Sequence, residues 1–310
     1  MTNWFQTNEC FEFYSSLSFL EPFKYEIKQG DEVKGRIVGY IQKDGSKIMQ
    51  FFSRRAIING GPMLAEDISN EEIQTLLSIC KTSLKNKVIY VESRNFIDYS
   101  RHKELFQDCG WFYEPHYNFH IDTSSSEIVE THLGRSRKRD IRTSLRAGAT
   151  FGEAESIDEV KKLYLILERL YTKKIKTPLF PWEFFEKLYY ASWGKIFVVR
   201  FEGRIVGGTV CVCGKETVYE WFACGEDGLT KNVFPSTLAT YSGIKYAEEN
   251  GAKRFDMMGA GAPDDGGYGV RDFKAKFGGE MVEHGRFRCI LNKPLFFIGK
   301  LGVTLIKKFK

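Results

Sequence analysis

The sequence predicts a mixed α/β fold that consists of two tandem copies of one domain. Residues 35–39 (Gly-Arg-Ile-Val-Gly) return unchanged as residues 203–207. The same offset in numbering aligns three further pairs along the chain: Gly110 with Gly278, His116 with His284, and Phe119 with Phe287. Matches of constant offset over such a stretch indicate a duplication. Helical patterns interleaved with hairpin-like strands favour mixed sheets over an all-parallel sheet.

The first copy is expected to contain two helices and four strands. Ser69, with acidic residues directly behind it, is typical of a helix start, and the helix is predicted to end near Leu84. A shorter helix ends at Gly110, and residues 59–62 form a loop. The predicted strands are residues 35–40, 47–52, 88–92 and 117–121, the first two of them joined by a turn at residues 43–46.

A basic helix over residues 126–148 is predicted to join the copies. Pro235 in the first turn and Gly251 just past the end indicate a helix over residues 235–250 of the second copy. The other elements expected there are helices over 157–173 and 181–190, and strands over 195–201, 205–213, 217–223, 254–258 and 285–291. The predicted domains are residues 1–125 and 126–292, followed by a tail of residues 293–310.

Composition limits the class of protein. The chain has 45 basic and 40 acidic residues, so its net charge of +5 permits an anionic partner without requiring one. Seven cysteines without a C-x-x-C pair predict neither a disulfide framework nor a metal site. Residues 1–20 lack the pattern of a signal peptide, and no apolar run is long enough to span a membrane. We therefore expect a cytoplasmic protein, either free or at the inner face of the plasma membrane.

The segment around Lys274 carries the main chemical signal. A predicted strand, a glycine-rich loop (residues 259–269) and a short cationic helix that stops at Gly278 follow one another. This order presents Lys274 at the mouth of a cleft, where a fixed cation would stabilise the oxyanion formed when an amine attacks a carbonyl. The alternative is a favourable charge at a helix C-terminus. Asp256, at the end of the strand, could orient the amine or accept its proton, or merely cap the loop.

Basic and aromatic residues elsewhere allow two interpretations each. Lys138, Arg142 and Arg146 share one helix face, which contacts phosphates or is simply solvated. Arg54 carries the same ambiguity. Tyr219 and Trp221 line the cleft wall or belong to the core.

The tail of residues 293–310 is basic and amphipathic. It either packs on the first domain or lies on an anionic membrane surface.

The motif Phe273-Lys274-x-x-Phe277-Gly278 resembles the C-terminal Phe-Lys motif of the FemABX family, the aminoacyltransferases that build peptidoglycan cross-bridges. The similarity extends over about residues 33–291. Four further motifs contribute to it: Ile58-x-Gly60-Gly61-Pro62, the basic stretch 137–142, Asn232-x-x-Pro235-Ser236-x-Leu238, and Lys253-x-Phe255-Asp256.

The resemblance implies two tandem GNAT-like acyltransferase domains without a permanently bound cofactor. It implies aminoacyl-tRNA as donor and, as acceptor, an amine of a lipid-linked or nucleotide-linked peptidoglycan precursor. Lys274 would stabilise the transition state, and Phe273 would shape the pocket beside it. Two departures stand out. The long helical arm of some members is missing between residues 157 and 190, and segment 225–232 lacks the pyrophosphate loop of acetyl-CoA-dependent enzymes.

The candidate catalytic residues are thus Lys274 and Asp256. The candidate substrate-binding residues are Phe273, Arg271, Tyr268, Tyr219, Trp221, Ser236, Arg54 and Arg142. Two alternative functions stay open. The first is an N-acyltransferase that uses acyl-CoA on a cell-envelope sugar or lipid-linked substrate, and the second is a non-catalytic module that binds a cell-wall precursor.

Overall fold

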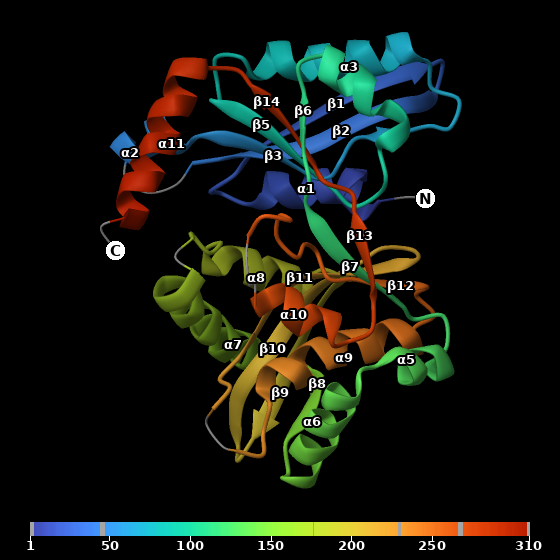
Figure 1. Cartoon of the computed structure of the whole chain (residues 1–310), viewed down its shortest axis with the longest axis vertical. Helices are drawn as coiled ribbons and strands as arrows, with labels where there is room; N and C mark the ends of the chain where they lie inside the picture. Colours follow the sequence, from blue (N-terminus) through green and yellow to red (C-terminus); the bar gives the residue numbers. More distant parts are fainter. Residues whose placement is uncertain (1–2, 44–46, 176, 229–230, 266–268, 309–310) are drawn as a thin grey trace. The chain divides into compact units, whose positions relative to one another are not determined.

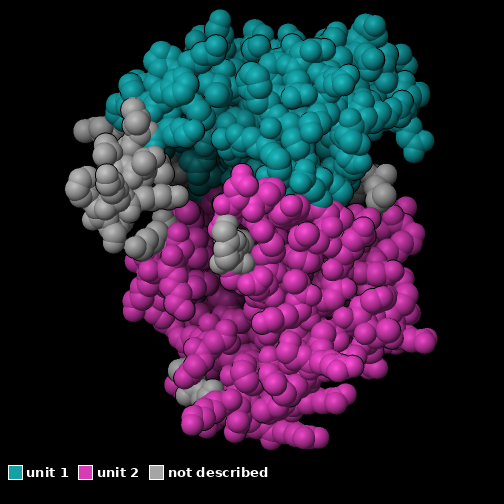
Figure 2. Space-filling model, viewed as in Figure 1, with its two compact units in different colours: residues 1–116, 283–310 teal, residues 117–282 magenta. Residues whose placement is uncertain are grey.

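The structure, a computed structural model, describes residues 3–43, 47–175, 177–228, 231–265 and 269–308. The chain forms two compact units, unit 1 (residues 1–116 and 283–310) and unit 2 (residues 117–282), which Figure 2 distinguishes by colour. Each unit contains one mixed sheet covered by helices (Figure 1). None of the helices in the described ranges is long and apolar enough to cross a membrane.

Unit 1 is built on a sheet with the strand order β1-β2-β3-β5-β14-β6, to which β4 adds through β2. Its strands are β1 (Glu21–Gln29), β2 (Glu32–Gln42), β3 (Arg55–Gly60), β4 (Met63–Leu64), β5 (Tyr90–Asn95), β6 (Phe112–Glu114) and β14 (Arg286–Ile290). Its helices are η1 (Trp4–Gln6), α1 (Asn8–Ser16), α2 (Lys47–Ser53), α3 (Asn70–Leu84), η2 (Ser100–His102), α4 (Lys103–Asp108) and α11 (Lys293–Lys308). Helix α3 begins as predicted, because Ser69 and Glu72 form a reciprocal capping box.

Unit 2 is built on a sheet with the strand order β13-β7-β12-β11-β10-β9-β8. Its strands are β7 (Tyr117–Asp122), β8 (Thr150–Glu153), β9 (Gly194–Phe201), β10 (Arg204–Cys213), β11 (Thr217–Gly225), β12 (Arg254–Asp256) and β13 (Glu280–Glu283). Its helices are α5 (Ser126–His132), α6 (Arg135–Arg146), α7 (Ile157–Leu170), the π-helical turn η3 (Tyr171–Ile175), α8 (Trp182–Tyr190), α9 (Pro235–Glu249) and α10 (Gly269–Ala275). Two strand pairs, β3 with β5 and β11 with β12, are parallel, which confirms the predicted mixed sheets.

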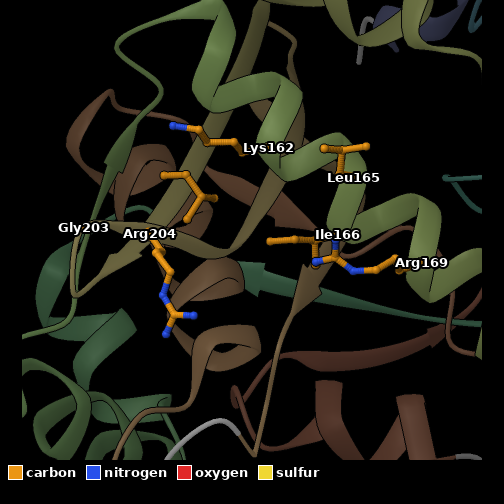
Figure 3. Close-up of a pocket in the computed structure, with 7 residues that line it drawn as sticks. Lys162, Leu165, Ile166, Arg169, Gly203 and Arg204 are labelled. Atoms are coloured by element: carbon orange, nitrogen blue, oxygen red, sulfur yellow. The ribbon is translucent and has the colours of Figure 1, made fainter.

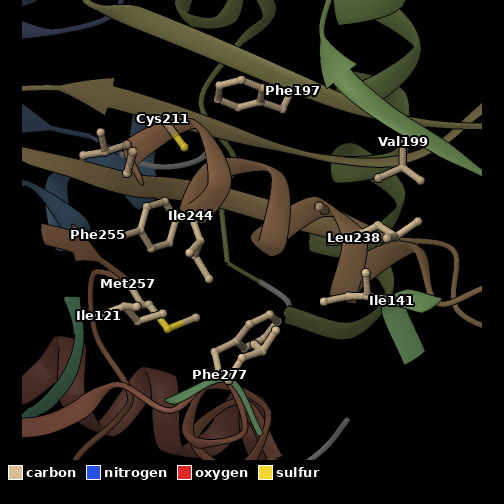
Figure 4. Packing of buried hydrophobic residues seen from close by; sticks show 14 of the residues in the cluster. Ile121, Ile141, Phe197, Val199, Cys211, Leu238, Ile244, Phe255, Met257 and Phe277 are labelled. Atoms are coloured by element: carbon tan, nitrogen blue, oxygen red, sulfur yellow. The ribbon is translucent and has the colours of Figure 1, made fainter. Parts of the chain in front are cut away.

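Adjacent glycines on β10 let a helix approach each face of this sheet. A Cβ on Gly207 would lie 3.2 Å from Pro235 of α9, and a Cβ on Gly208 would lie 2.9 Å from Leu163 of α7. Neighbouring residues of a strand point to opposite faces, so the two helices cover opposite sides of β10. Helix α9 closes the core in which Phe255, Met257 and Phe277 are buried (Figure 4).

The last strand of each sequence copy lies in the sheet of the other unit. Strand β7 pairs with β12 in unit 2, where His120 stands opposite Asp256. Strand β14 pairs with β5 in unit 1, where Arg288 stands opposite Glu92. His120 and Arg288 are themselves related by the offset of the repeat. The boundaries between the two units therefore lie at residues 116/117 and 282/283, whereas the boundary between the two sequence copies was predicted at 125/126.

The predicted strand over residues 47–52 is wrong, because this segment forms helix α2. The apolar residues Met49 and Phe52 share a helix face by their spacing of three. Helix α2 contacts α11, which belongs to unit 1. The turn predicted over residues 43–46 falls mostly outside the described residues.

The single basic helix predicted over residues 126–148 is also wrong, because it is broken at Gly134 into α5 and α6. The backbone N–H of Gly134 donates to the Lys276 carbonyl at 3.1 Å. A Cβ on Gly134 would lie 2.4 Å from that oxygen. The close approach of another chain segment thus requires glycine and ends the helix there.

Candidate functional site

The loop that follows β12 is held in an uncommon backbone conformation. Met258 has a φ of +51°, a left-handed value that a non-glycine residue rarely adopts, and Gly259 follows with +101°. Such a conformation persists only when its surroundings enforce it, and it is frequent at functional sites. The candidate catalytic residues Asp256 and Lys274 lie before and after this loop in the chain.

Lys274, near the end of α10, reaches back to the loop. Its Nζ donates to the carbonyl oxygens of Met257 and of Gly259, the latter at 2.8 Å. Burial lowers the pKa of the Lys274 ammonium, and the charges of Glu220 and Asp256 only partly oppose this effect. An ammonium has three N–H donors, so the two carbonyls leave one for a further oxygen.

Arg271, one turn earlier on α10, extends the same arrangement. Its Nε donates to the Ala260 carbonyl at 3.1 Å, and its terminal NH2 donates to the Ala262 carbonyl. The guanidinium lies over the Tyr117 ring, 4.9 Å from its centroid. Two cations of α10 therefore fix four carbonyls of the loop, which makes Arg271 a positioning residue in this structure.

Asp256 is 1% exposed and forms the centre of a polar network. Its Oδ1 accepts from Asn118 Nδ2 at 2.7 Å and from the Met258 N–H at 2.8 Å, while its Oδ2 lies 3.2 Å from His120 Nε2. Burial by itself would raise the pKa of Asp256, but His120, Asn118 and the Met258 N–H together lower it. Asn118 also accepts from the Gly259 N–H at 2.8 Å. This geometry fits a role of Asp256 as a cap of the loop better than a role as a base that substrate can reach.

Glu220 is a buried carboxyl near Lys274 that the sequence analysis did not select. It is 5% exposed, and Thr209 Oγ1 donates to its Oε1 at 3.4 Å. Burial raises the pKa of Glu220, and the charge of Lys274 partly reverses this increase. The sequence feature that could have identified Glu220 is its position as an acidic residue in the middle of an otherwise apolar predicted strand.

Tyr219 and Trp221 flank Glu220 but are not equivalent. Tyr219 is buried opposite Asp256 in the parallel pair β11–β12, and burial raises its pKa. The register of β10 and β11 skips Trp221, so this residue forms a β-bulge. Its ring packs 4.9 Å from the Phe184 ring of α8, in an aromatic cluster. The structure thus places the partly buried Trp221 against α8.

Phe273 is partly buried, and its ring meets Phe277 edge to face at 5.3 Å. The buried guanidinium of Arg137 lies 4.3 Å from the Phe273 ring centroid and donates to the Phe273 carbonyl at 3.1 Å. Burial lowers the pKa of Arg137, although Asp140 opposes this. Arg137 of the basic segment therefore fastens α6 to α10 and is not part of a solvated face.

The other predicted binding residues are dispersed. Ser236 lies in the first turn of α9, where its N–H donates to Asp227 Oδ1 at 3.1 Å. Arg142 is exposed on α6. Arg54 belongs to unit 1, with its guanidinium 4.9 Å from the Phe51 ring centroid. Tyr268 lies outside the described residues.

Three hollows of the described surface of unit 2 border residues named above or other cations. One of about 460 Å³ is bordered by His120, which connects it to Asp256, and by His132, Lys253 and Arg254. A second, of about 350 Å³, follows the cationic side of α6 and is lined by Arg135, Lys138, Arg139, Arg142, Thr143 and Arg146. A third, of about 280 Å³, lies between α7 and the β9–β10 turn, where Lys162, Arg169 and Arg204 surround it (Figure 3). Within the described ranges no group of His, Cys, Asp and Glu side chains is arranged to hold a metal.

The fold and this site define a class of protein. Residues 135–274 match the family model of the acetyltransferase (GNAT) domain, so this part of unit 2 is similar to GNAT domains. The chain as a whole has the FemABX-like tandem GNAT fold.

Solved structures resemble the chain over almost its full length. The crystal structure of FemX has a TM-score of 0.72 at 14% identity and covers 96% of this chain and 94% of its own. The C-terminal domain of a putative lysylphosphatidylglycerol synthetase from Agrobacterium fabrum has a TM-score of 0.63 at 13% identity and covers 96% of each chain. A tandem GNAT protein from the clavulanic acid biosynthesis pathway has a TM-score of 0.54 at 9% identity, covering 88% of this chain and 84% of its own. No curated protein matches the chain in sequence.

Proposed function

We propose that this protein transfers an aminoacyl group from an aminoacyl-tRNA to an amine of a peptidoglycan precursor. The observation that carries the proposal is the Lys274 ammonium, which two backbone carbonyls fix in place. In the proposed reaction its third N–H donor binds a substrate oxygen. Similarity of fold to FemX and to a putative lysylphosphatidylglycerol synthetase supports a cell-envelope acceptor.

The reaction follows from the position of this cation. The acceptor amine attacks the ester carbon of the donor, and the carbonyl oxygen gains negative charge that Lys274 stabilises. The C–N bond forms, the C–O bond to the ribose breaks, and the amine proton goes to the departing ribose oxygen, directly or through water. In this scheme Asp256, Asn118 and His120 position the loop and do not touch the substrate.

Features near α9 and α6 favour a tRNA ester over acyl-CoA as donor. Asp227 already places a carboxylate at the N-terminus of α9, where it accepts from the Ser236 N–H. A carboxylate there opposes the binding of a second anion, such as a diphosphate, at this helix end. The exposed cations of α6, including Lys138, Arg142 and Arg146, offer phosphate contacts on a separate surface.

Transfer with the purified full chain tests the proposal. Charged tRNA and acyl-CoA are supplied separately, each with a nucleotide-linked or lipid-linked precursor. We expect product with charged tRNA, a loss of about 10²–10³ in kcat for Lys274→Met, and a change within about twofold for Lys276→Ala. Lys276 is the matched control, because it is an exposed lysine close by in the same segment.

The pH profile separates a chemical role of Lys274 from a structural one. If the ammonium stabilises the oxyanion, activity falls as the pH rises through its lowered pKa, and Lys274→Arg moves this alkaline limb upward. Product with acyl-CoA alone contradicts the donor assignment. Precursor binding without turnover, unchanged in Lys274→Met, supports the non-catalytic module instead.

A further inference from the structure

Helices α2 and α11 of unit 1 contact each other and lie side by side in Figure 1. Five large apolar side chains on these two helices are exposed, and we call this surface the α2/α11 face. Its members and their exposed fractions are Met49 (54%), Phe51 (47%), Phe52 (40%), Phe297 (59%) and Ile298 (51%).

This concentration differs from the rest of the described surface. Eight other large apolar residues are exposed among the described residues, and they are scattered over both units on separate elements. Single exposed apolar residues are normal, whereas a cluster marks a surface that another phase or molecule covers. We therefore expect another molecule or a membrane to cover the α2/α11 face.

The start of α11 is anchored, so the exposure of Phe297 and Ile298 is not that of a detached tail. The Phe296 ring packs edge to face on Tyr90, with centroids 5.5 Å apart, and lies 6.0 Å from the Arg288 guanidinium. Asn292 Oδ1 accepts from the Leu295 N–H at 3.1 Å, which caps the helix. With Phe296 directed to the sheet, Phe297 and Ile298 are directed to solvent.

The two sequence segments that form this face carry charges of one sign. Residues 293–310 contain five lysines and no acidic residue, and residues 47–55 contain one lysine, two arginines and no acidic residue. Exposed Lys293 and Lys300 flank the apolar side chains of α11, and Arg54 lies 4.9 Å from the centroid of the Phe51 ring. Apolar side chains that lie between cations complement a partner surface with an anionic outer layer and an apolar layer below it.

We propose that the α2/α11 face docks unit 1 on an anionic lipid bilayer. Phe297, Ile298 and the α2 phenylalanines enter the boundary between headgroups and acyl chains, while the lysines contact anionic headgroups. The proposal does not depend on the Lys274 site, and vesicle binding is measured without any transfer reaction.

Vesicle flotation of the purified full chain tests the docking. We expect binding to vesicles of equal parts phosphatidylglycerol and phosphatidylcholine, and at least ~tenfold weaker binding to phosphatidylcholine alone. The double variant Phe297→Ser/Ile298→Ser should bind the anionic vesicles about tenfold less. Lys293→Glu should lose about fivefold or more, and added salt should weaken wild-type binding.

Phe112→Ser is the matched control, because Phe112 is 57% exposed in the same unit but lies on β6. It should bind vesicles like the wild type, and thermal melting should show all variants folded. Equal binding of wild type and Phe297→Ser/Ile298→Ser overturns the proposal, as does failure of the wild type to bind either vesicle. Concentration-dependent dimers that the double variant abolishes, without vesicle binding, overturn it in favour of a second copy as occupant.

Discussion

Equivalent positions of the two units carry opposite kinds of residue. The offset of the repeat places Phe106 where unit 2 has Lys274. Phe106 is fully buried, with its ring 4.5 Å from that of Phe287, whereas Lys274 carries a desolvated ammonium. Helix α4, which contains Phe106, and helix α10, which contains Lys274, are each followed by a glycine of nearly the same φ, +84° at Gly110 and +81° at Gly278. The same backbone thus supports an apolar contact in one unit and a charge in the other.

The exchanged strands show the same contrast. In unit 1, Glu92 is held by Arg94 at 2.8 Å, Arg288 at 2.9 Å and Arg286 at 3.4 Å. In unit 2 the corresponding Asp256 accepts a hydrogen bond from the neutral Asn118 at 2.7 Å and lies 3.2 Å from His120. Three arginines therefore surround the carboxylate of unit 1, whereas an amide and a histidine contact that of unit 2.

A third position follows from the strand register. In unit 1, Ile57 of β3 pairs with Glu92, and in unit 2, Tyr219 of β11 pairs with Asp256. Ile57 and Tyr219 are therefore equivalent, and so are the next residues of these strands, Ile58 and Glu220. Ile58 is fully buried in the core of unit 1. At these positions unit 1 has a buried ring, a buried isoleucine and a carboxylate paired with arginines, while unit 2 has a lysine and two buried carboxyl groups without an arginine partner among the described salt bridges.

Phe106→Ala should have the largest effect on stability. Removal of a fully buried aromatic ring leaves a cavity and should cost about 3–5 kcal/mol. Lys274→Met should cost less, about 1–2 kcal/mol, because removal of a desolvated charge partly offsets the loss of the donor to the Met257 and Gly259 carbonyls. Urea denaturation measures both. Equal losses would show that Lys274 is as structural as Phe106 and would remove the contrast.

Glu92→Gln should be the next most destabilising change. It leaves three neighbouring arginines without their shared carboxylate, at a cost of about 2–4 kcal/mol, whereas Asp256→Asn should cost about 1–2 kcal/mol. Thermal and urea unfolding at neutral pH compare the two variants. A larger loss for Asp256→Asn would reverse the comparison.

The pH dependence of stability sharpens this result. Burial by itself would raise the pKa of Glu92, but the charges of Arg94 and Arg286 and the hydrogen bonds of Arg94 and Arg288 lower it far below its usual range. Because the folded pKa is depressed, the stabilisation is present above the unfolded pKa of about 4.3 and is lost as the pH falls below it toward the folded pKa. The wild type should lose stability in this acidic window, and Glu92→Gln should lose less. Parallel pH profiles would contradict this assignment.

Glu220→Gln should have the smallest effect on stability, and it should stabilise the protein rather than destabilise it. Burial raises the pKa of Glu220 above its unfolded value, so its stabilising contribution is present at low pH and is lost as the pH rises through the folded pKa. The amide should therefore gain on the order of 1 kcal/mol near neutral pH, and this gain should fade on acidification. The matched change Gln42→Glu, at the end of β2, should show no such pH-dependent difference because Gln42 is only partly buried. A loss of stability in Glu220→Gln at neutral pH would mean that the Lys274 interaction outweighs burial.

By itself the sequence determined the repeat, most helices and the place of the Lys274 motif. These features depend on local patterns: caps at Ser69, Pro235 in a first turn, and glycines that stop short helices. Lys274 and Phe273 could be selected because their motif is contiguous. The mixed α/β fold followed from the order of these local elements, and the tandem GNAT domains followed from the family resemblance.

Only the tertiary structure decided which distant residues meet. The exchange of β7 and β14 brings His120 to Asp256 and Arg288 to Glu92, and no local pattern encodes a partner so far away in the chain. The helix at α2 and the break at Gly134 likewise depend on contacts with α11 and with Lys276. Glu220 escaped selection because the sequence shows only its charge, while its pKa is set by burial among strands that fold around it.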